Sequence, residues 1–127
     1  LPAHDGLWQA AETTAHDLLA RLAVVPLVLE ARGLDRTPGM IARLDSFGDR
    51  ESADVLRVIY ADEIGHVAIG KRWFDWLCEK RGLAPMPTWQ TLVRQHFKGD
   101  LKAPFNEAGR AAAGFPTSYL EAFAGAP

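Results

Sequence analysis

The stretch Asp62-Glu63-Ile64-Gly65-His66 lies in the middle of a long segment whose apolar spacing predicts one helix from about Asp49 to Arg81. Glu63 and His66 are three residues apart, so an α-helix projects both side chains from the same face. Because that face is otherwise largely apolar, we expect the carboxylate and the imidazole to lie within a buried stripe. The apolar positions are Leu56, Ile59, Tyr60, Val67, Gly70, Phe74 and Leu77.

An ionised glutamate in such a stripe needs a compensating partner. Removing a carboxylate from water is costly unless a cation or a strong hydrogen-bond donor replaces the lost hydration. The sequence therefore predicts that something is bound beside Glu63. Gly65 and Gly70 each cost the helix about 1 kcal/mol relative to alanine, and we expect them to let another helix approach closely here.

The length and composition indicate one domain. The 127 residues, of which 48% are hydrophobic, suffice for a single core, so we expect one domain over residues 1–127. The formal charge of −2 gives no electrostatic reason to expect nucleic acid or an anionic membrane as a partner. No uninterrupted apolar run reaches the roughly 18 to 20 residues of a membrane span.

Cys78 is the single cysteine of the chain, which excludes an intrachain disulfide and any site that needs several thiolate ligands. This cysteine usage suits a reducing compartment, and we expect a cytoplasmic location. Cys78 itself is expected to be a small buried core residue.

The segment before the Glu63 helix predicts another long helix. Asp5 is a candidate N-cap, apolar residues recur at helical spacing over Leu7–Arg32, and Gly33 is a candidate terminating glycine. Pro26 removes a backbone hydrogen bond and should kink this helix one turn before Glu30. Glu30 also follows apolar residues at helical spacing, which places it on an apolar stripe. The alternative is that Glu30 reaches solvent from a fraying helix end.

Shorter elements complete the predicted all-α architecture. Thr37 and Pro38 are a candidate cap and first helical residue, and Gly82 is expected to end the long helix. The remaining expected elements are a helix over Pro38–Phe47, a helix over Trp89–Phe97, a surface loop over Lys98–Asn106, and short helices over Glu107–Ala113 and Pro116–Ala124.

The two long helices together suggest a metal site. One helix offering Glu30 and an antiparallel one offering Glu63 and His66 would supply half of the ligand set of a di-iron or di-manganese carboxylate bundle. Glu-x-x-His alone is a weak signal, because it occurs by chance in many helices. In the completed site Glu63 would bridge the two metals, with Glu30 and His66 as terminal ligands. Oxygen and nitrogen donors favour Fe or Mn over metals that prefer thiolates.

Other polar residues have simpler explanations. Glu12 and His16 lie roughly 20 Å or more from Glu30 along the same predicted helix, so we expect a solvated or interhelical pair. Tyr60 is one turn from Glu63 and could hydrogen-bond a ligand carboxylate. Asp62 could accept a hydrogen bond from a ligand imidazole or pair with Arg32. Two further histidines are expected at the surface or in caps, namely His4 and His96.

Several runs also carry a resemblance to a known family. They are Arg21-Leu22-Ala23, Glu30-Ala31-Arg32-Gly33-Leu34-Asp35, Asp62-Glu63-Ile64-Gly65-His66-Val67, Trp73-Phe74, Pro104-Phe105-Asn106, Arg110 and Ala113-Gly114. Across nearly its whole length the chain resembles the C-terminal half of the bacterial ferritin-like proteins known as the domain of unknown function 455 family. The resemblance implies a ferritin-like fold with Glu30, Glu63 and His66 as metal ligands, and no settled reaction. It gives no physical role for Arg110 beyond anchoring the C-terminal segment.

The family's preceding helix pair, which should bring a second glutamate and a second Glu-x-x-His, has no counterpart here. We therefore expect an antiparallel bundle of two long helices and short C-terminal helices, which is half of a four-helix bundle. The missing N-terminal half of the same chain could complete the site, and the first residue, Leu1, favours this arrangement. Alternatively, a two-fold homodimer would bring four glutamates and two histidines together.

The preferred function is a di-metal carboxylate oxidoreductase that uses O₂ or peroxide on an unknown small-molecule substrate. One alternative is a non-enzymatic metal-binding or storage bundle. Another is a metal-free helical interaction module, in which Glu63 would be neutral or paired with Arg32 or Arg57.

Overall fold

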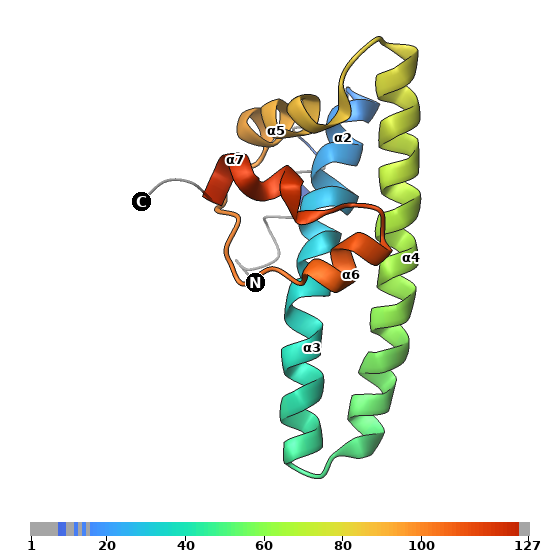
Figure 1. Ribbon diagram of the computed structural model, residues 1–127, viewed down its shortest axis with the longest axis vertical. Helices are drawn as coiled ribbons and strands as arrows, with labels where there is room; N and C mark the ends of the chain where they lie inside the picture. Colours follow the sequence, from blue (N-terminus) through green and yellow to red (C-terminus); the bar gives the residue numbers. More distant parts are fainter. Residues whose placement is uncertain (1–7, 10–11, 13, 15, 125–127) are drawn as a thin grey trace.

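The computed structural model describes residues 8–9, 12, 14 and 16–124, and all of the regular structure in these ranges is helical. The predicted all-α class is therefore confirmed. Two long antiparallel rods dominate the molecule, and the short C-terminal helices pack against one half of them (Figure 1). None of the helices in the described ranges combines the length and the apolarity needed to cross a membrane.

The first rod is formed by α2 (Leu18–Val24), the π-helical segment η2 (Val25–Glu30) and α3 (Ala31–Ser46), which follow one another without a break. The second rod is α4 (Arg50–Lys80), which returns beside the first (Figure 1). The C-terminal elements are α5 (Pro85–His96), α6 (Glu107–Ala112), the 3₁₀-helix η3 (Thr117–Leu120) and α7 (Glu121–Ala124).

Helix α4 confirms the long helix predicted around Glu63. Its 31 residues span about 46 Å at 1.5 Å per residue. The Asp49 carboxylate accepts a hydrogen bond of 3.1 Å from the Ser52 amide, which caps the helix and lowers the pKa of Asp49. Glycines with positive φ bound the helix at both ends, at Gly48 and Gly82.

The first rod begins later than the sequence predicts. Asp17 has an extended backbone, and its carboxylate accepts hydrogen bonds from the Leu19 and Ala20 amides, so the helix starts at Leu18. Thr14 and His16 lie in a turn before this cap, which breaks the continuous helix expected over Leu7–Arg32. The expected N-cap at Asp5 lies outside the described residues.

The predicted end of this rod at Gly33 is wrong, as is the separate helix predicted to start at Pro38. Gly33 does not have a positive φ, and α3 runs through both residues to Ser46. Pro38 has no amide hydrogen to donate to the Leu34 carbonyl. The Asn106 side chain supplies this missing donor, because its Nδ2 lies 2.9 Å from the Leu34 oxygen. A contact from the far end of the chain thus allows the helix to continue.

A buried ion pair holds the same C-terminal segment to α3. Arg110 donates to both oxygens of Asp35, with an Nε–Oδ1 distance of 3.0 Å and an Nη2–Oδ2 distance of 2.7 Å. The Asn106 amide donates to the same carboxylate at 2.8 Å. The Arg110 guanidinium also lies near the rings of Phe105 and Phe115. These contacts explain the Pro104-Phe105-Asn106 and Arg110 motif as a structural tether.

The core lies where the first rod meets α4 and α5. The indole of Trp89 is fully buried and donates a hydrogen bond of 3.0 Å to the Ala23 carbonyl. Around it, Phe115, Tyr119 and Phe123 make edge-to-face ring contacts. Cys78 is buried as predicted.

The C-terminal helices differ in detail from their prediction. Helix α5 starts at Pro85 rather than Trp89, because proline is well placed in a first helical turn. The expected helix over Pro116–Ala124 is a 3₁₀ turn followed by one α-helical turn. The loop predicted before Asn106 and the helix predicted from Glu107 are both present.

Pro26 and Gly70 mark the closest approach of the two rods. A Cβ placed on Gly70 would lie 2.5 Å from the Pro26 Cβ, which is an overlap. The prediction that Gly70 admits a neighbouring helix is therefore confirmed. At Gly65 no atom of the described residues lies within 4 Å of such a Cβ, so the predicted close approach is not found there.

We expect Gly70→Ala to destabilise the protein by about 1 to 3 kcal/mol, because the added methyl group must displace Pro26. The matched control, Gly65→Ala, should be neutral or stabilise by up to about 1 kcal/mol through helix propensity. Urea unfolding followed by circular dichroism measures both. Equal effects of the two substitutions would contradict the close packing at Gly70.

We expect Asn106→Ala to destabilise the protein by about 2 to 4 kcal/mol, because it removes the cap of α6 and leaves the Leu34 carbonyl without a donor. The neighbouring Glu107 is exposed, so Glu107→Ala serves as the control with a change near zero. Backbone amide exchange around Pro38 should accelerate only in the Asn106 variant. Unchanged exchange there would argue against the hydrogen bond to Leu34.

Candidate metal centre

Glu30 is the last residue of the π-helical segment η2. The Ala31 amide, which follows it, donates to the Pro26 carbonyl five residues earlier, as a π-helix requires. Pro26 cannot donate to the carbonyl four residues before it, which weakens the α-helical pattern at this point. The kink predicted at Pro26 is thus a widened helical turn. Turns of this kind occur often at functional sites.

Glu63 and His66 lie on the middle of α4, on the same face as their spacing predicts. The His66 Nδ1 is 3.8 Å from the Glu63 Oε2, so the two side chains lie against each other. A Cβ placed on Gly33 would be 3.7 Å from the Glu63 Cγ. The Glu63 side chain therefore lies over Gly33 of the first rod.

Glu30 of the first rod lies within electrostatic range of this pair. Burial raises the pKa of the Glu30 carboxyl above its ordinary value, the Glu63 carboxylate raises it further, and His66 opposes the rise. The charges of Glu30, Glu63 and His66 thus influence one another across two antiparallel helices. Among the described residues, no lysine or arginine forms an ion pair with either glutamate.

One polar atom in this group has no partner. The Glu63 Oε1 is buried and accepts no hydrogen bond from any described residue. A buried carboxylate oxygen normally has a partner, because its desolvation is otherwise uncompensated. The site is therefore suited to a cation that binds Glu63 directly.

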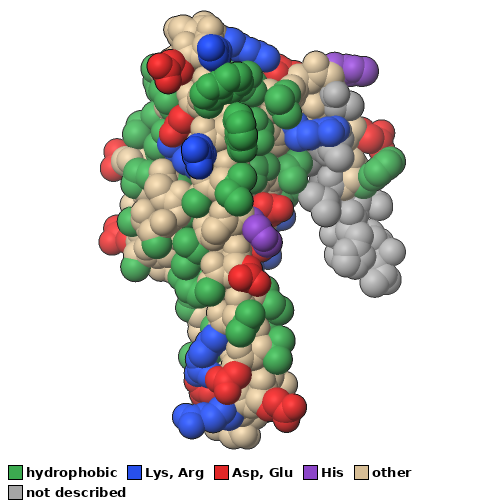
Figure 2. All heavy atoms as spheres, turned by 90° about the vertical axis from the view of Figure 1, so that its right-hand side faces the viewer, with side chains coloured by type: hydrophobic (Ala, Val, Ile, Leu, Met, Phe, Trp, Pro, Cys, Tyr) green, Lys and Arg blue, Asp and Glu red, His purple; other side chains and the backbone are tan. Residues whose placement is uncertain are grey.

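The predicted burial of this helix face is confirmed at Val67, Gly70 and Phe74, but it is wrong for His66 and only partial for Glu63. The His66 side chain is 60% exposed and that of Glu63 is 23% exposed. Figure 2 looks onto this face of α4, where hydrophobic side chains lie above and below acidic and histidine side chains. The exposed apolar residues of α4 are Val55, Val58, Ile59, Ile69, Trp73 and Trp76. No other helix of the described chain covers this exposed stripe of α4.

The three residues do not form a complete metal site. Within the described part of the chain, no three His, Cys, Asp or Glu side chains are grouped closely enough to hold a metal ion. The types of donor fit a carboxylate metal centre, and their number fits half of one.

The other polar residues proposed from the sequence, where the structure describes them, form no hydrogen bond or ion pair with the candidate ligands. The Tyr60 hydroxyl accepts a hydrogen bond of 2.7 Å from Asn106, so it supports the C-terminal tether. Asp62 is exposed and forms no ion pair with Arg32 within the described residues. Glu12 and His16 are exposed as well. The π-helical turn was missed by sequence reasoning, although Pro26 was the available signal.

We expect Glu30→Gln to stabilise the metal-free protein at neutral pH. A raised carboxyl pKa adds stability that is full below the unfolded value of 4.5 and is lost as the pH rises through the folded pKa. Glutamine does not titrate, so the variant should lose this pH dependence and gain up to about 1 kcal/mol after allowance for solvent screening.

Urea unfolding in the presence of a chelator, from acidic to neutral pH, measures this difference. Glu79→Gln is the control, because Glu79 is an exposed glutamate of α4 for which the same change in charge is made at the surface. A loss of stability in the Glu30 variant at neutral pH would show that the carboxylate has a favourable partner.

Comparisons with known proteins agree with these sequence features. The model of the family described as "Protein of unknown function (DUF455)" matches residues 1–121. A curated relative from Haemophilus influenzae, named only as an uncharacterized protein, is 42% identical over 119 residues. That alignment covers 94% of this chain and 41% of the relative, so the chain spans about two fifths of the relative's length. No solved structure matches the chain. The extent of the family match shows that the chain belongs to the DUF455 family of proteins of unknown function.

Proposed function

We propose that this chain is half of a ferritin-like di-metal carboxylate protein that acts as an O₂- or peroxide-using oxidoreductase. The observation that carries this proposal is the meeting of Glu30, Glu63 and His66 from two antiparallel helices, with the Glu63 Oε1 buried and unpartnered. Two glutamates on facing helices, one of them in Glu-x-x-His, are half of the ligand set of such proteins.

The charges support a cation at this position. The Glu30 and Glu63 carboxylates repel each other, and burial adds to the cost of ionising Glu30. A divalent metal ion compensates both effects, since it is the largest positive charge that such a site can hold. The π-helical turn that ends at Glu30 is consistent with a site, because retaining an irregular turn requires a compensating advantage.

The donor types favour iron or manganese. The two glutamates and His66 offer oxygen and nitrogen, and the buried Cys78 thiol is not part of the cluster. Carboxylates and imidazole suit Fe and Mn, whereas metals that prefer soft ligands favour thiolates. Such a metal pair would supply redox chemistry with O₂ or peroxide.

The chain's own residues would bind and orient the metal pair. Glu30 and Glu63 would balance its charge, and His66 would act as the neutral donor. Beside them, Val67 is fully buried and Ile64 is packed against the core, so apolar side chains limit water on the inner side of the site. The substrate is not specified by any of these residues.

The second half of the site would come from another pair of helices. Exposed apolar side chains lie along one face of α4, on both sides of acidic and histidine side chains (Figure 2). An exposed apolar surface of this extent is typical of an interaction site. Because the chain spans 41% of its Haemophilus relative, we assign this face to a helix pair elsewhere in the longer polypeptide. A second copy of the chain is the competing arrangement.

The metal-free interaction module has less support. It requires Glu63 to be neutral or paired with Arg32 or Arg57. Arg57 instead pairs with Asp45 and Asp54, and Arg32 lies over the ring of Phe97. Neither arginine therefore pairs with Glu63 in this structure.

Metal content tests the proposed centre. The protein is purified without chelators, and its mass in solution shows whether an assembly with a second half site is present. In such an assembly, elemental analysis should find Fe or Mn. Glu63→Gln and His66→Leu should each lower the metal content at least about tenfold, because each removes a ligand. Glu79→Gln on the same helix should leave it unchanged.

The result also separates the alternatives. A metal-loaded homodimer would show that a second copy of the chain, rather than another helix pair of a longer polypeptide, supplies the second half of the site. Uptake and oxidation of Fe(II) without turnover of any organic substrate would favour storage over catalysis. Two results together would overturn the metal centre. The folded assembly would remain metal-free after incubation with Fe(II) or Mn(II), and replacing both Glu63 and His66 would leave its stability unchanged or higher.

A further inference from the structure

A cavity of about 400 Å³ lies between α3 and the loop that joins α5 to α6. Neither glutamate of the candidate metal centre lines it, and neither does His66. Its volume is in the range of pockets that bind small organic molecules. Helix α3 supplies Arg32, Arg36 and Arg43, whose spacings of four and seven residues place them on one face of the helix.

The charges that line this cavity are strongly unbalanced. Two acidic residues line the cavity, Asp35 and Asp100. Asp35 is already bound by Arg110, which leaves Asp100 as the carboxylate that opposes the other cations. Arg36 and Arg43 form no ion pair with any carboxylate of the described residues. Burial lowers the pKa of the Arg32 guanidinium, and the charge of Arg36 lowers it further. The cationic side chains of the lining are Arg32, Arg36, Arg43, Lys102 and Arg110.

Arg110 adds a second, independent observation. Its side chain is 3% exposed, and it lines this cavity. Its Nε and Nη2 bind Asp35, whereas its Nη1 is buried with no hydrogen-bond partner among the described residues. A guanidinium donor that is buried without a partner is costly, so an anion beside it would be stabilised.

The wall of the cavity also has an apolar part, formed by Met40 of α3 and by Leu101, Pro104 and Phe105 of the loop. Such a wall suits the organic part of a ligand rather than a free inorganic ion. The cavity therefore combines several cations with an apolar surface, which is the pattern expected for an organic anion.

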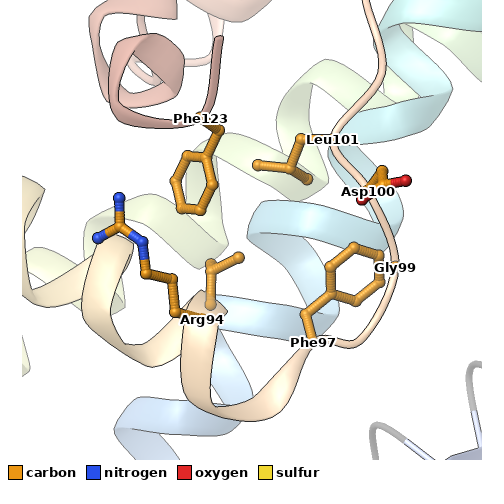
Figure 3. A pocket seen from close by; sticks show the side chains of 7 residues that line it. Arg94, Phe97, Gly99, Asp100, Leu101 and Phe123 are labelled. Carbon is orange, nitrogen blue, oxygen red and sulfur yellow. The ribbon is translucent and has the colours of Figure 1, made fainter. Parts of the chain in front are cut away.

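A smaller cavity on the other side of the same loop does not share these properties (Figure 3). There Arg94 already lies over the ring of Phe123 and donates to the Ala122 carbonyl at 3.4 Å. The Asp100 carboxylate points away from Arg94 and Phe123 in this view. The unpaired cations thus belong to the α3 side of the loop.

We propose that the α3 cavity is a binding site for a small phosphorylated organic molecule, with Arg36 and Arg43, two turns apart on one face of α3, binding the phosphate. Arginines that approach from several positions can donate to different oxygens of one phosphate, and they remain charged at all physiological pH values. The apolar wall with Phe105 contacts the organic group. This site is independent of the metal centre, because it uses none of its residues.

Phenyl phosphate and inorganic phosphate are the probes, because they share the anionic group and differ in the ring. Titration calorimetry on the full chain in the presence of a chelator should show phenyl phosphate binding more tightly than inorganic phosphate. The chelator keeps the result independent of metal binding. Failure of this site would therefore leave the metal centre untested, and the reverse also holds.

The arginine variants decide whether binding occurs in this cavity. Arg36 and Arg43 are exposed, so the double substitution Arg36→Gln and Arg43→Gln should fold normally and bind phenyl phosphate at least about tenfold more weakly. Asp100→Asn should strengthen binding, because it removes the opposing carboxylate. The control replaces two exposed arginines of α4 that lie outside the cavity, Arg50→Gln and Arg72→Gln, with the same change in net charge.

Equal weakening by the cavity and control variants would mean non-specific attraction to positive charge and would overturn the site. No measurable binding of phenyl phosphate at millimolar concentration would overturn it as well. Equal affinity for phenyl phosphate and inorganic phosphate would contradict the part assigned to the apolar wall.

Discussion

The hydrogen bond from the Asn106 side chain to the Leu34 carbonyl is the contact on which the arrangement of the first rod depends. Pro38 deprives that carbonyl of its donor, and a proline inside a helix typically costs about 3 kcal/mol or more. Asn106 restores the donor, and the neighbouring Arg110 pairs with Asp35 on the same helix. Residues about seventy positions apart in sequence thereby hold α3 as a continuation of α2 and η2.

The continuous rod places different chemistry on different faces. Glu30, at the end of the π-helical turn, lies beside Glu63 and His66 of α4. Two residues later, Arg32 begins the basic face that turns toward the loop before α6. Adjacent turns of one helix thus contribute to a carboxylate cluster and to a basic cavity. The basic cavity depends on the tether, since Arg110 and the loop before α6 both line it.

The candidate metal centre is open on the exposed face of α4. Glu63 has one buried oxygen without a partner, whereas His66 is largely exposed beside it. A site that is closed on the side of the first rod and open on the other is consistent with the proposed half site. Covering it would bury the exposed apolar side chains of α4 and supply the remaining donors in one step.

Helical spacing and capping act within one or two turns, so the all-α class, the extent of α4 and the shared face of Glu63 and His66 could be predicted from local sequence. The same was true of the close approach at Gly70. The passage of α3 through Gly33 and Pro38 could not be predicted in this way, since the compensating donor comes from Asn106 in the folded chain. The basic face escaped prediction for the same reason: a helix broken at Gly33 does not align Arg32 with Arg36 and Arg43. A local pattern cannot reveal a hydrogen bond that is formed by distant residues.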